Sequence, residues 1–330
     1  MLINSGRYGL LDNFQDLDKV STGDNSKEAV FQVQYSMDDG SNSAGRVDWS
    51  NLLNAPQGPY SGDGFFLPSQ DLIDSYQTDD NGLPEFDSYY KQHFDEWDAS
   101  QGKTINNTHN VDPRVDFVVG RPGVTWKTYT KSPYENTWVR DQATYGQHST
   151  KRFFVSPESD EMFKGWPWGA SALNWNIIRY ADILLWKAEA LIEMNQNLDV
   201  ARQLINQVRH RAANKAYWVK DFNDNTKYAA NYKIAEYPAA GWTQVYARKA
   251  LRYETRLETA MEGERFFDLV RWGIAAETMN AYYSREKSLR SYYNNAQFTA
   301  GKNEYLPISV TQYNLSNGAY TQNPGYASFK

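Results

Sequence analysis

The sequence contains no cysteine, no long apolar run and no excess of basic residues. Without cysteine, the chain forms neither disulfide bonds nor thiolate metal sites. No segment approaches the ~18–20 consecutive apolar residues that a bilayer-spanning helix needs. The formal net charge of −6 argues against nucleic-acid binding, because phosphate recognition requires a basic face.

The common catalytic and metal-binding motifs are missing as well. The 4 histidines show no H-E-x-x-H spacing, and there is no G-x-S-x-G nucleophile turn. The acidic turn at 78–82 offers Asp79 and Asp80 as oxygen ligands for a hard cation such as Ca²⁺. A solvated turn explains the same residues, so we expect no cofactor and keep Ca²⁺ at this turn as the alternative.

Aromatic residues are the class in excess, since 11 Trp, 24 Tyr and 15 Phe make up 15% of the chain. Packing explains many of these rings, because each one buries a large apolar area. The remainder suits a protein that stacks rings on flat ligand faces. Rings in loops are the better candidates, because binding residues concentrate in loops that a rigid scaffold holds.

The first half of the chain reads as irregular structure. Residues 1–175 are rich in Gly, Asn, Asp, Ser and Pro, which favour turns and loops. The segment 29–35 alternates in a way that predicts a short strand. A short helix is expected within 68–76, with Ser69 as its N-cap.

The second half reads as helical. Residues 174–195 and 200–214 carry apolar side chains at helical spacing. The brief turn between them makes the two helices antiparallel. Together they have the length of one tetratricopeptide hairpin, ~34 residues. Thr243 starts a further helical block that extends to about Trp272.

The charged stretch MEGERFFDLVRWG, 261–273, raises the question of an active site. On a helix, Asp268 lies three residues from both Arg265 and Arg271, so these side chains can pair. A column at i, i+4 spacing precedes them, formed by Glu254, Glu258 and Glu262 with Arg252 and Arg256 beside it. We interpret the stretch as a structural helix with Phe267 and Trp272 packed. A carboxylate pair that flanks a glycosidic bond is the alternative.

Several segments, taken in order, resemble those of the SusD/RagB family. They are NSKEAVFQVQY, FFLPSQDLIDSYQTDDNG, DPRVDFVV, NIIRYADILLWKAEALIEMN, ARQLINQVRHRA, RYETRLETAMEGERFFDLVRWG, NEYLPIS and QNPGY. Together they cover nearly the whole chain, although Glu264 stands where the family often has histidine. The resemblance implies a mainly α fold, in which tetratricopeptide-like helical hairpins at 176–330 form a scaffold and the loop-rich region 1–175 packs on it.

The resemblance also implies a function. Family members are surface lipoproteins of Bacteroidetes-type bacteria that capture glycans or other nutrients. They are not enzymes, and they deliver their ligands to a SusC-type TonB-dependent transporter in the outer membrane. They begin with a lipoprotein signal, a lipidated cysteine and several further helices. We therefore expect this chain to be a C-terminal portion, attached to the membrane only through a lipid anchor outside this sequence.

The resemblance places the ligand face in the loops upstream of the segment RYAD, 179–182. The stacking candidates in those loops are Trp49, Tyr60, Tyr89, Tyr90, Trp97 and Trp126. Burial beneath a loop is the alternative for each of them, and we expect packing for Trp166 and Trp168. Two other functions stay open, a glycoside hydrolase with a carboxylate pair and a helical-repeat scaffold that binds only proteins.

Overall fold

The computed structural model describes residues 2–40, 44–98, 100, 103–105, 107–128, 130–131 and 138–329. For Trp97, Lys103, Thr130 and Lys131 the description is limited to the backbone. The chain divides into two compact units, Met1–Glu262 and Gly263–Lys330. The predicted boundary at residue 175, between a loop-rich region and a helical scaffold, lies inside the first unit. That division stays a proposal about the roles of residues 1–175 and 176–330.

The longest elements of the first unit are helices, and its strands are short. Every sheet in the described part of the chain is two-stranded. The helices are α1 (Val20–Gly23), α2 (Gln57–Tyr60), α3 (Gln70–Asp74), α4 (Arg114–Val118), α5 (Gln142–Tyr145), α6 (Tyr180–Glu193), α7 (Leu198–Ala212) and α8 (Gln244–Glu258). The strands are β1 (Ala29–Val33), β2 (Glu96–Asp98), β3 (Lys103–Ile105), β4 (Asn110–Val111), β5 (Val119–Gly120), β6 (Thr125–Trp126), β7 (Thr130–Lys131), β8 (Ser149–Thr150), β9 (Trp175–Arg179) and β10 (Asn231–Tyr232). This composition confirms the expected mainly α fold.

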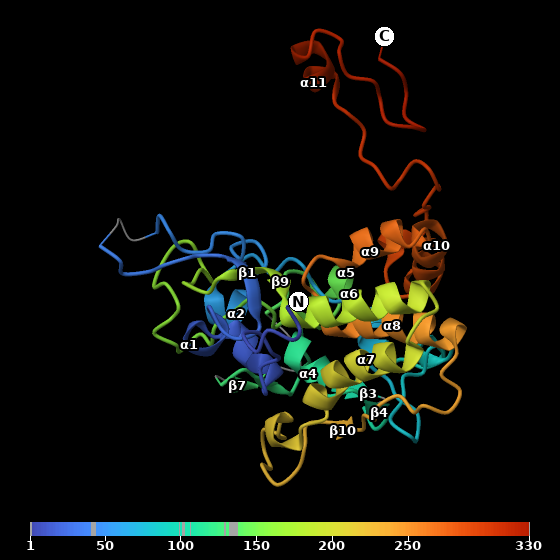
Figure 1. Cartoon of the computed structure of the whole chain (residues 1–330). Coiled ribbons are helices and arrows are strands. Elements are labelled where there is room, and N and C mark those ends of the chain that lie inside the picture. The colour runs from blue at the N-terminus through green and yellow to red at the C-terminus, as the bar shows by residue number, and fades with distance from the viewer. Residues whose placement is uncertain are drawn as a thin grey trace. The chain divides into compact units, whose positions relative to one another are not determined.

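Helices α6, α7 and α8 lie side by side and form the scaffold (Figure 1). Ala188 on α6 and Ala201 on α7 are fully buried, and their small side chains let the helices approach closely. Asn197 precedes α7 with φ of 48°, a conformation that asparagine tolerates better than most residues. The shared core includes Leu184, Leu185, Ile192, Leu204, Ile205, Val208, Ala247, Ala250 and Leu251. The antiparallel hairpin predicted from periodicity is confirmed, but its first helix begins at Tyr180, because Trp175–Arg179 form the strand β9.

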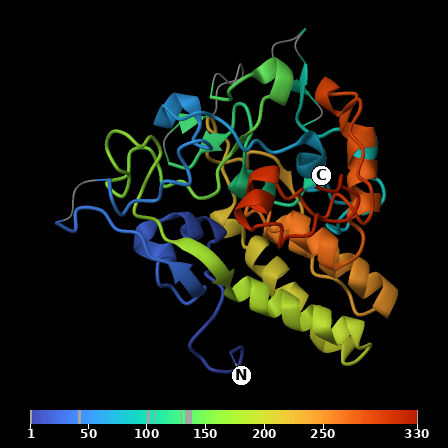
Figure 2. The same ribbon diagram turned by 90° about the horizontal axis from the view of Figure 1, so that it is seen from above.

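The strand pair β1–β9 joins the loop-rich segment to this scaffold. The two strands are antiparallel, with Ala29 opposite Arg179 and Val33 opposite Trp175. Because α6 begins directly after β9, the pairing fixes where the hairpin starts. The carboxylate of Asp182 accepts a hydrogen bond from the Arg179 backbone N–H at 2.7 Å and so satisfies a group at the start of α6. Figure 2 shows the loops of the first unit gathered on one side of the helices.

The short elements expected in the loop-rich segment are present. The strand predicted within 29–35 is β1. The helix predicted within 68–76 is α3, and its N-cap is Ser69. The Ser69 hydroxyl accepts a hydrogen bond from the Leu72 N–H at 3.2 Å.

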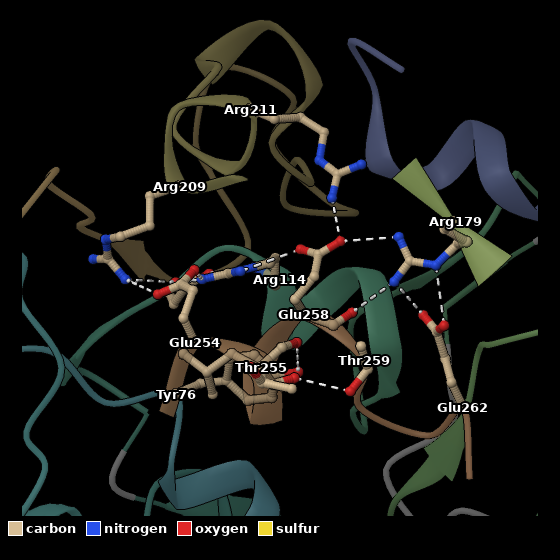
Figure 3. A network of polar contacts seen from close by, with 12 residues as sticks. Tyr76, Arg114, Arg179, Arg209, Arg211, Glu254, Thr255, Glu258, Thr259 and Glu262 are labelled. Carbon is tan, nitrogen blue, oxygen red and sulfur yellow. Dashed lines mark hydrogen bonds and ion pairs between the residues drawn. The ribbon is translucent and has the colours of Figure 1, made fainter. Parts of the chain in front are cut away.

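A buried ion network connects α8 to other segments of the first unit (Figure 3). The carboxylate of Glu254 lies 2.7 Å from the Arg114 guanidinium and 2.9 Å from that of Arg209. One helical turn later, Glu258 lies 3.1 Å from Arg179. Both glutamates are completely buried, so their charges depend on these partners.

The network continues past the end of α8. Glu262 pairs with Arg179 at 2.8 Å and with Arg152 at 2.9 Å. Arg211 pairs with Glu258 and lies 3.0 Å from Glu28, just before β1. Guanidinium groups from β9, α7 and the segment after β8 therefore converge on one edge of α8.

This arrangement corrects the expectation that the glutamate column pairs along its own helix. The partners that bury it come from segments far away in sequence, and Arg256 pairs with Asp71 at 2.7 Å. Glu254 and Glu258 have no exposed surface through which a substrate could reach them. The column is structural, as the sequence predicts, but it stabilises tertiary rather than helical contacts.

The second unit contains α9 (Arg265–Arg271), α10 (Ala275–Glu286), a 3-10 turn η4 (Ser291–Tyr293) and α11 (Val310–Leu315). Leu269 of α9, Ala275 of α10 and Phe298 form a small core. Asp268 and Arg271 form an ion pair at 2.8 Å. Arg265 and Arg271 lie over the Trp272 ring, 5.8 and 4.8 Å from its centroid. Phe267, for which we expected packing, is 65% exposed. None of the described helices is both long and apolar enough to cross a membrane.

Candidate functional site

Two tryptophans from distant parts of the first unit meet at its surface. The rings of Trp49 and Trp166 lie 4.7 Å apart between centroids, at an interplanar angle of 85°. They are 43% and 56% exposed, and Trp168, two residues later, is 42% exposed. In edge-to-face contact the edge of one ring covers one face of the other, and the rest of the pair accounts for this exposure. Exposed clusters of large apolar side chains mark binding surfaces in soluble proteins.

A buried carboxylate shapes the turn that carries Trp49. Asp48 accepts hydrogen bonds from the Ser50 N–H at 2.8 Å and from the Asn51 amide at 2.9 Å. Burial raises the pKa of Asp48, while the hydrogen bonds from Ser50 oppose that rise. The indole N–H of Trp49 itself donates to the Ala44 carbonyl at 2.7 Å. The ring is therefore held in one orientation by its own turn.

Trp166 is carried by a hairpin-like loop that is bonded to the same turn. The loop is closed by a hydrogen bond from Phe163 N–H to the Ala170 carbonyl at 2.9 Å. The Asp48 N–H donates to the Ser171 carbonyl at 2.9 Å, which ties the loop to the Trp49 turn. Backbone hydrogen bonds thus place the two indoles together before any ligand arrives.

Glycine is required where this loop approaches the chain beneath it. Gly169 has φ of +76°, and a Cβ at this position would lie 2.5 Å from the Cβ of Ala55. Such a distance is far below normal van der Waals contact, so no side chain fits without a backbone shift. The glycine keeps the Trp166 loop close to its base.

The base is a buried aromatic cluster formed by Ala55, Tyr60, Trp126, Trp138 and Phe154. Tyr60 donates its hydroxyl hydrogen to the Val155 carbonyl at 2.7 Å. The indole N–H of Trp126 donates to the Tyr60 oxygen at 3.3 Å. Because its polar atoms are satisfied internally, this cluster gives the exposed rings a rigid support.

Polar groups accompany further exposed apolar side chains on the same loops. Leu53, Phe65 and Phe66 are 56%, 39% and 46% exposed. The guanidinium of Arg140 lies over the Phe65 ring, 4.5 Å from its centroid, and bonds the Asp63 carbonyl oxygen at 3.2 Å. This loop therefore combines an apolar face with charged donors and acceptors.

The predicted stacking residues fall into three groups: exposed rings, one ring outside the described side chains, and rings that the protein covers. Trp49 belongs to the exposed pair. Tyr90 is 41% exposed and makes an edge-to-face contact with Tyr89, with 5.3 Å between the ring centroids. The Trp97 side chain lies outside the described residues, although its backbone belongs to β2.

The third group is covered by the protein itself. Tyr60, Tyr89 and Trp126 are 3%, 6% and 0% exposed. Tyr60 and Trp126 belong to the aromatic base, and the Tyr89 oxygen accepts a hydrogen bond from Arg256 at 3.0 Å. We correct the expectation for these three rings, because a ligand cannot stack on a face that the core already covers.

The acidic turn at 78–82 is built by its own backbone. Asp79 accepts hydrogen bonds from the N–H groups of Asn81 and Leu83 at 2.8 and 2.9 Å, and Asp80 accepts one from the Asn110 amide at 3.1 Å. Among the described residues, no group of three or more His, Cys, Asp or Glu side chains is arranged to hold a metal ion. The contacts favour the solvated-turn interpretation of Asp79 and Asp80.

Sequence reasoning missed Trp166 and Trp168, for which we expected packing. Both are exposed, and Trp166 completes the aromatic pair. The available signal was the segment GWPWG itself, because two glycines and a proline around two rings indicate a surface turn. Periodicity could not identify Trp49 as its partner.

The first unit combines a helical scaffold with exposed aromatic rings on the loops attached to it. This arrangement is typical of binding surfaces and points to no particular reaction. The model of the SusD family matches residues 27–326. The chain therefore belongs to the SusD family, which confirms the resemblance in its sequence. No curated protein matches the chain.

Solved structures share this fold. A SusD superfamily protein from Bacteroides vulgatus is 21% identical with a TM-score of 0.60, over 98% of this chain and 56% of that chain. Surface glycan-binding protein A from Bacteroides fluxus is 18% identical with a TM-score of 0.62, over 98% and 56%. A laminarin-binding SusD-like protein is 22% identical with a TM-score of 0.53, over 98% and 55%. The chain thus spans little more than half the length of these structures.

Proposed function

We propose that this chain is part of a non-catalytic protein that captures oligosaccharides at the cell surface, with Trp49 and Trp166 as its main stacking rings. The observation that carries the proposal is the exposed pair on a rigid base. A pyranose ring has a face of C–H groups that suits an indole face. Its rim of hydroxyls suits charged side chains such as Arg140 and Asp63.

Membership of the SusD family supports this proposal. Two of the structures with the same fold are described as a laminarin-binding protein and as a surface glycan-binding protein. In this proposal the loop-rich segment 1–175 carries the ligand face and 176–330 forms the scaffold. The whole protein would be held in the outer membrane by a lipid anchor and would deliver its ligand to a SusC-type TonB-dependent transporter.

The charged stretch at 261–273 and the glutamates of α8 before it give no support to the hydrolase alternative. Glu258 and Glu262 are engaged by guanidinium groups, and Asp268 pairs with Arg271. A general acid and a nucleophile must instead face one open bond. We therefore propose that the protein binds glycans without cleaving them.

Native gels cast with single polysaccharides test the proposal. Laminarin, starch, xylan and mucin glycans would be compared, using the complete protein without its lipid anchor. One polysaccharide should retard the protein and should be recovered intact. Trp49→Ala and Trp166→Ala should each abolish the retardation.

Trp186→Ala is the matched control, because Trp186 is an equally exposed tryptophan on α6, 48% accessible. It should leave retardation unchanged. Retardation that survives both loop substitutions would refute the stacking site. Breakdown of the polysaccharide would favour the hydrolase, and retardation by no glycan would favour a scaffold that binds only proteins.

A further inference from the structure

A separate polar cavity of about 480 Å³ opens between the segment 13–21, Lys127 and Thr128, Lys151 and the segment 156–161. Its size falls within the ~300–1,000 Å³ range of small-molecule sites. Trp49 and Trp166 do not line it. The cavity therefore requires its own explanation.

The floor of the cavity is built from buried charged groups. Asp18 is 3% exposed and is held by Arg152 at 2.7 Å and by the ammonium of Lys127 at 3.2 Å. Lys151 is also 3% exposed, and its amine donates to the carbonyls of Asp116 at 2.8 Å and Thr125 at 2.7 Å. An ammonium carries three N–H donors, so these two carbonyls leave one donor of Lys151 for a ligand.

Lys151 can act as a donor or as an acceptor near neutral pH. Burial lowers its pKa, Asp116 opposes this effect and the nearby cations Arg121 and Lys127 add to it, which together bring the pKa to about 7. A neutral amine has a lone pair that accepts a hydrogen bond. A sugar hydroxyl, which both donates and accepts, matches either form.

The walls add fixed acceptors, hydroxyls and one apolar face. Glu161 accepts hydrogen bonds from the N–H groups of Val20 at 3.0 Å and Ser21 at 2.8 Å, which orient its carboxylate. At the rim, the Thr128 hydroxyl donates to that of Ser156 at 2.8 Å. The Phe117 ring contributes the apolar part of the lining.

The charges around the cavity balance. Three lysines and three carboxylates line it, so the lining has no net charge when Lys151 is protonated and a single net negative charge when Lys151 is neutral: Lys19, Lys127, Lys151, Asp18, Glu158 and Glu161. A phosphate or a uronic acid would meet the carboxylates, and a cation would meet the lysines. A neutral polyhydroxyl compound makes hydrogen bonds with both sets and loses little to repulsion.

We propose that this cavity is a second ligand site that takes a neutral mono- or disaccharide unit, away from the aromatic surface. The inference rests on the proposed function for its ligand class, since both sites take carbohydrate. It differs in chemistry, because hydrogen bonds from buried polar groups hold the sugar here, whereas stacking dominates at Trp49 and Trp166.

Short sugars distinguish the two sites. Laminaribiose, cellobiose, maltose and N,N′-diacetylchitobiose would be titrated into the protein by calorimetry and by saturation-transfer NMR. Thr128→Trp places an indole in the mouth of the cavity. It should weaken binding of the disaccharide that the protein accepts by about tenfold or more.

Thr226→Trp is the matched control. Thr226 is also an exposed threonine that bonds a neighbouring side chain, with its hydroxyl 2.6 Å from Asp224, but it does not line the cavity. This variant should bind the disaccharide like wild type. The inference would be overturned if Thr128→Trp bound the disaccharide as tightly as wild type, or if the protein bound none of the four disaccharides.

The outcome separates this inference from the proposed function. In one outcome, Trp49→Ala and Trp166→Ala abolish polysaccharide retardation, Thr128→Trp keeps it, and no disaccharide binds. That outcome supports the aromatic site and refutes the cavity site. In the other outcome, Thr128→Trp abolishes disaccharide binding and no polysaccharide retards the protein. That outcome supports the cavity site and refutes the aromatic site.

Discussion

Arg179 and Glu258 lie 3.1 Å apart in the interior of the first unit, although one ends β9 and the other ends α8. The same guanidinium also lies 2.8 Å from Glu262 and 2.9 Å from Glu28. A single side chain therefore ties the loop-rich segment, the start of the hairpin and α8 together. The loops that carry the exposed rings are attached to a frame that ion pairs hold in place.

Removing one carboxylate from this network should be costly. Glu258→Gln removes one buried counter-charge that Arg114, Arg179 and Arg211 share. Glu28 and Glu262 remain, but the buried guanidinium groups are then under-compensated, so the free energy of unfolding should fall by about 3–5 kcal/mol. The control is Glu193→Gln, which breaks the exposed pair with Arg248 at 2.7 Å and should cost less than about 1 kcal/mol. Urea unfolding followed by circular dichroism measures both, and equal losses would contradict a structural role for the network.

The same carboxylate predicts a pH dependence of stability. Burial raises the pKa of Glu258, but the guanidinium groups of Arg211, Arg179 and Arg114 outweigh burial and lower it from 4.5 to about 2. Between these two values the unfolded chain binds more protons than the folded protein. The stabilisation is therefore complete above pH 4.5 and is lost as the pH falls toward 2.

The free energy of unfolding, measured at intervals from pH 5 to pH 2, tests this sign. Wild-type protein should lose stability more steeply with falling pH than Glu258→Gln, because the variant has no carboxylate to protonate at this position. Parallel curves for the two proteins would show that Glu258 does not titrate with a lowered pKa.

Gly169 should be sensitive to any added side chain. Gly241 has nearly the same φ, +75° against +76°, but a Cβ there would meet no atom within 4 Å. Gly241→Ala should therefore cost about 1–2 kcal/mol from backbone strain alone. Gly169→Ala should cost about 1–3 kcal/mol more, because its Cβ meets Ala55. Thermal unfolding compares the two, and equal costs would mean that the Trp166 loop does not approach its base closely.

Buried and exposed tryptophans should respond differently to truncation. Trp126→Ala opens a cavity in the aromatic base and should cost about 3–5 kcal/mol of stability. Trp49→Ala should cost less than about 1 kcal/mol, because its ring is nearly half exposed. Chemical unfolding of both variants tests the division between core and ligand rings. A large loss for Trp49→Ala would assign that ring to packing.

The helical elements were predictable because their signals are local. Apolar spacing located α6 and α7, and the caps at Ser69 and Thr243 located the starts of α3 and α8. The charge column of α8 was visible for the same reason. Its partners Arg114 and Arg179 were not, because no local pattern indicates which distant guanidinium groups fold against it.

The candidate site was only partly predictable for a related reason. Trp49 and Trp126 both stand in segments rich in turn residues, yet one is exposed and the other is completely buried. The sequence shows which rings occur in such segments. Whether a ring is buried depends on which distant segment packs over it. The pairing of Trp49 with Trp166 depends on the backbone hydrogen bond between Asp48 and Ser171, which closes a long loop.

Hydroxyl-radical footprinting of the tryptophans, with and without the polysaccharide that retards the protein, tests the central claim most directly. Oxidation at each indole would be quantified by mass spectrometry, with Trp186 as the internal reference. The account predicts that bound glycan protects Trp49 and Trp166 and leaves Trp186 unchanged. Oxidation of Trp49 and Trp166 at the same rate with and without bound glycan would contradict it.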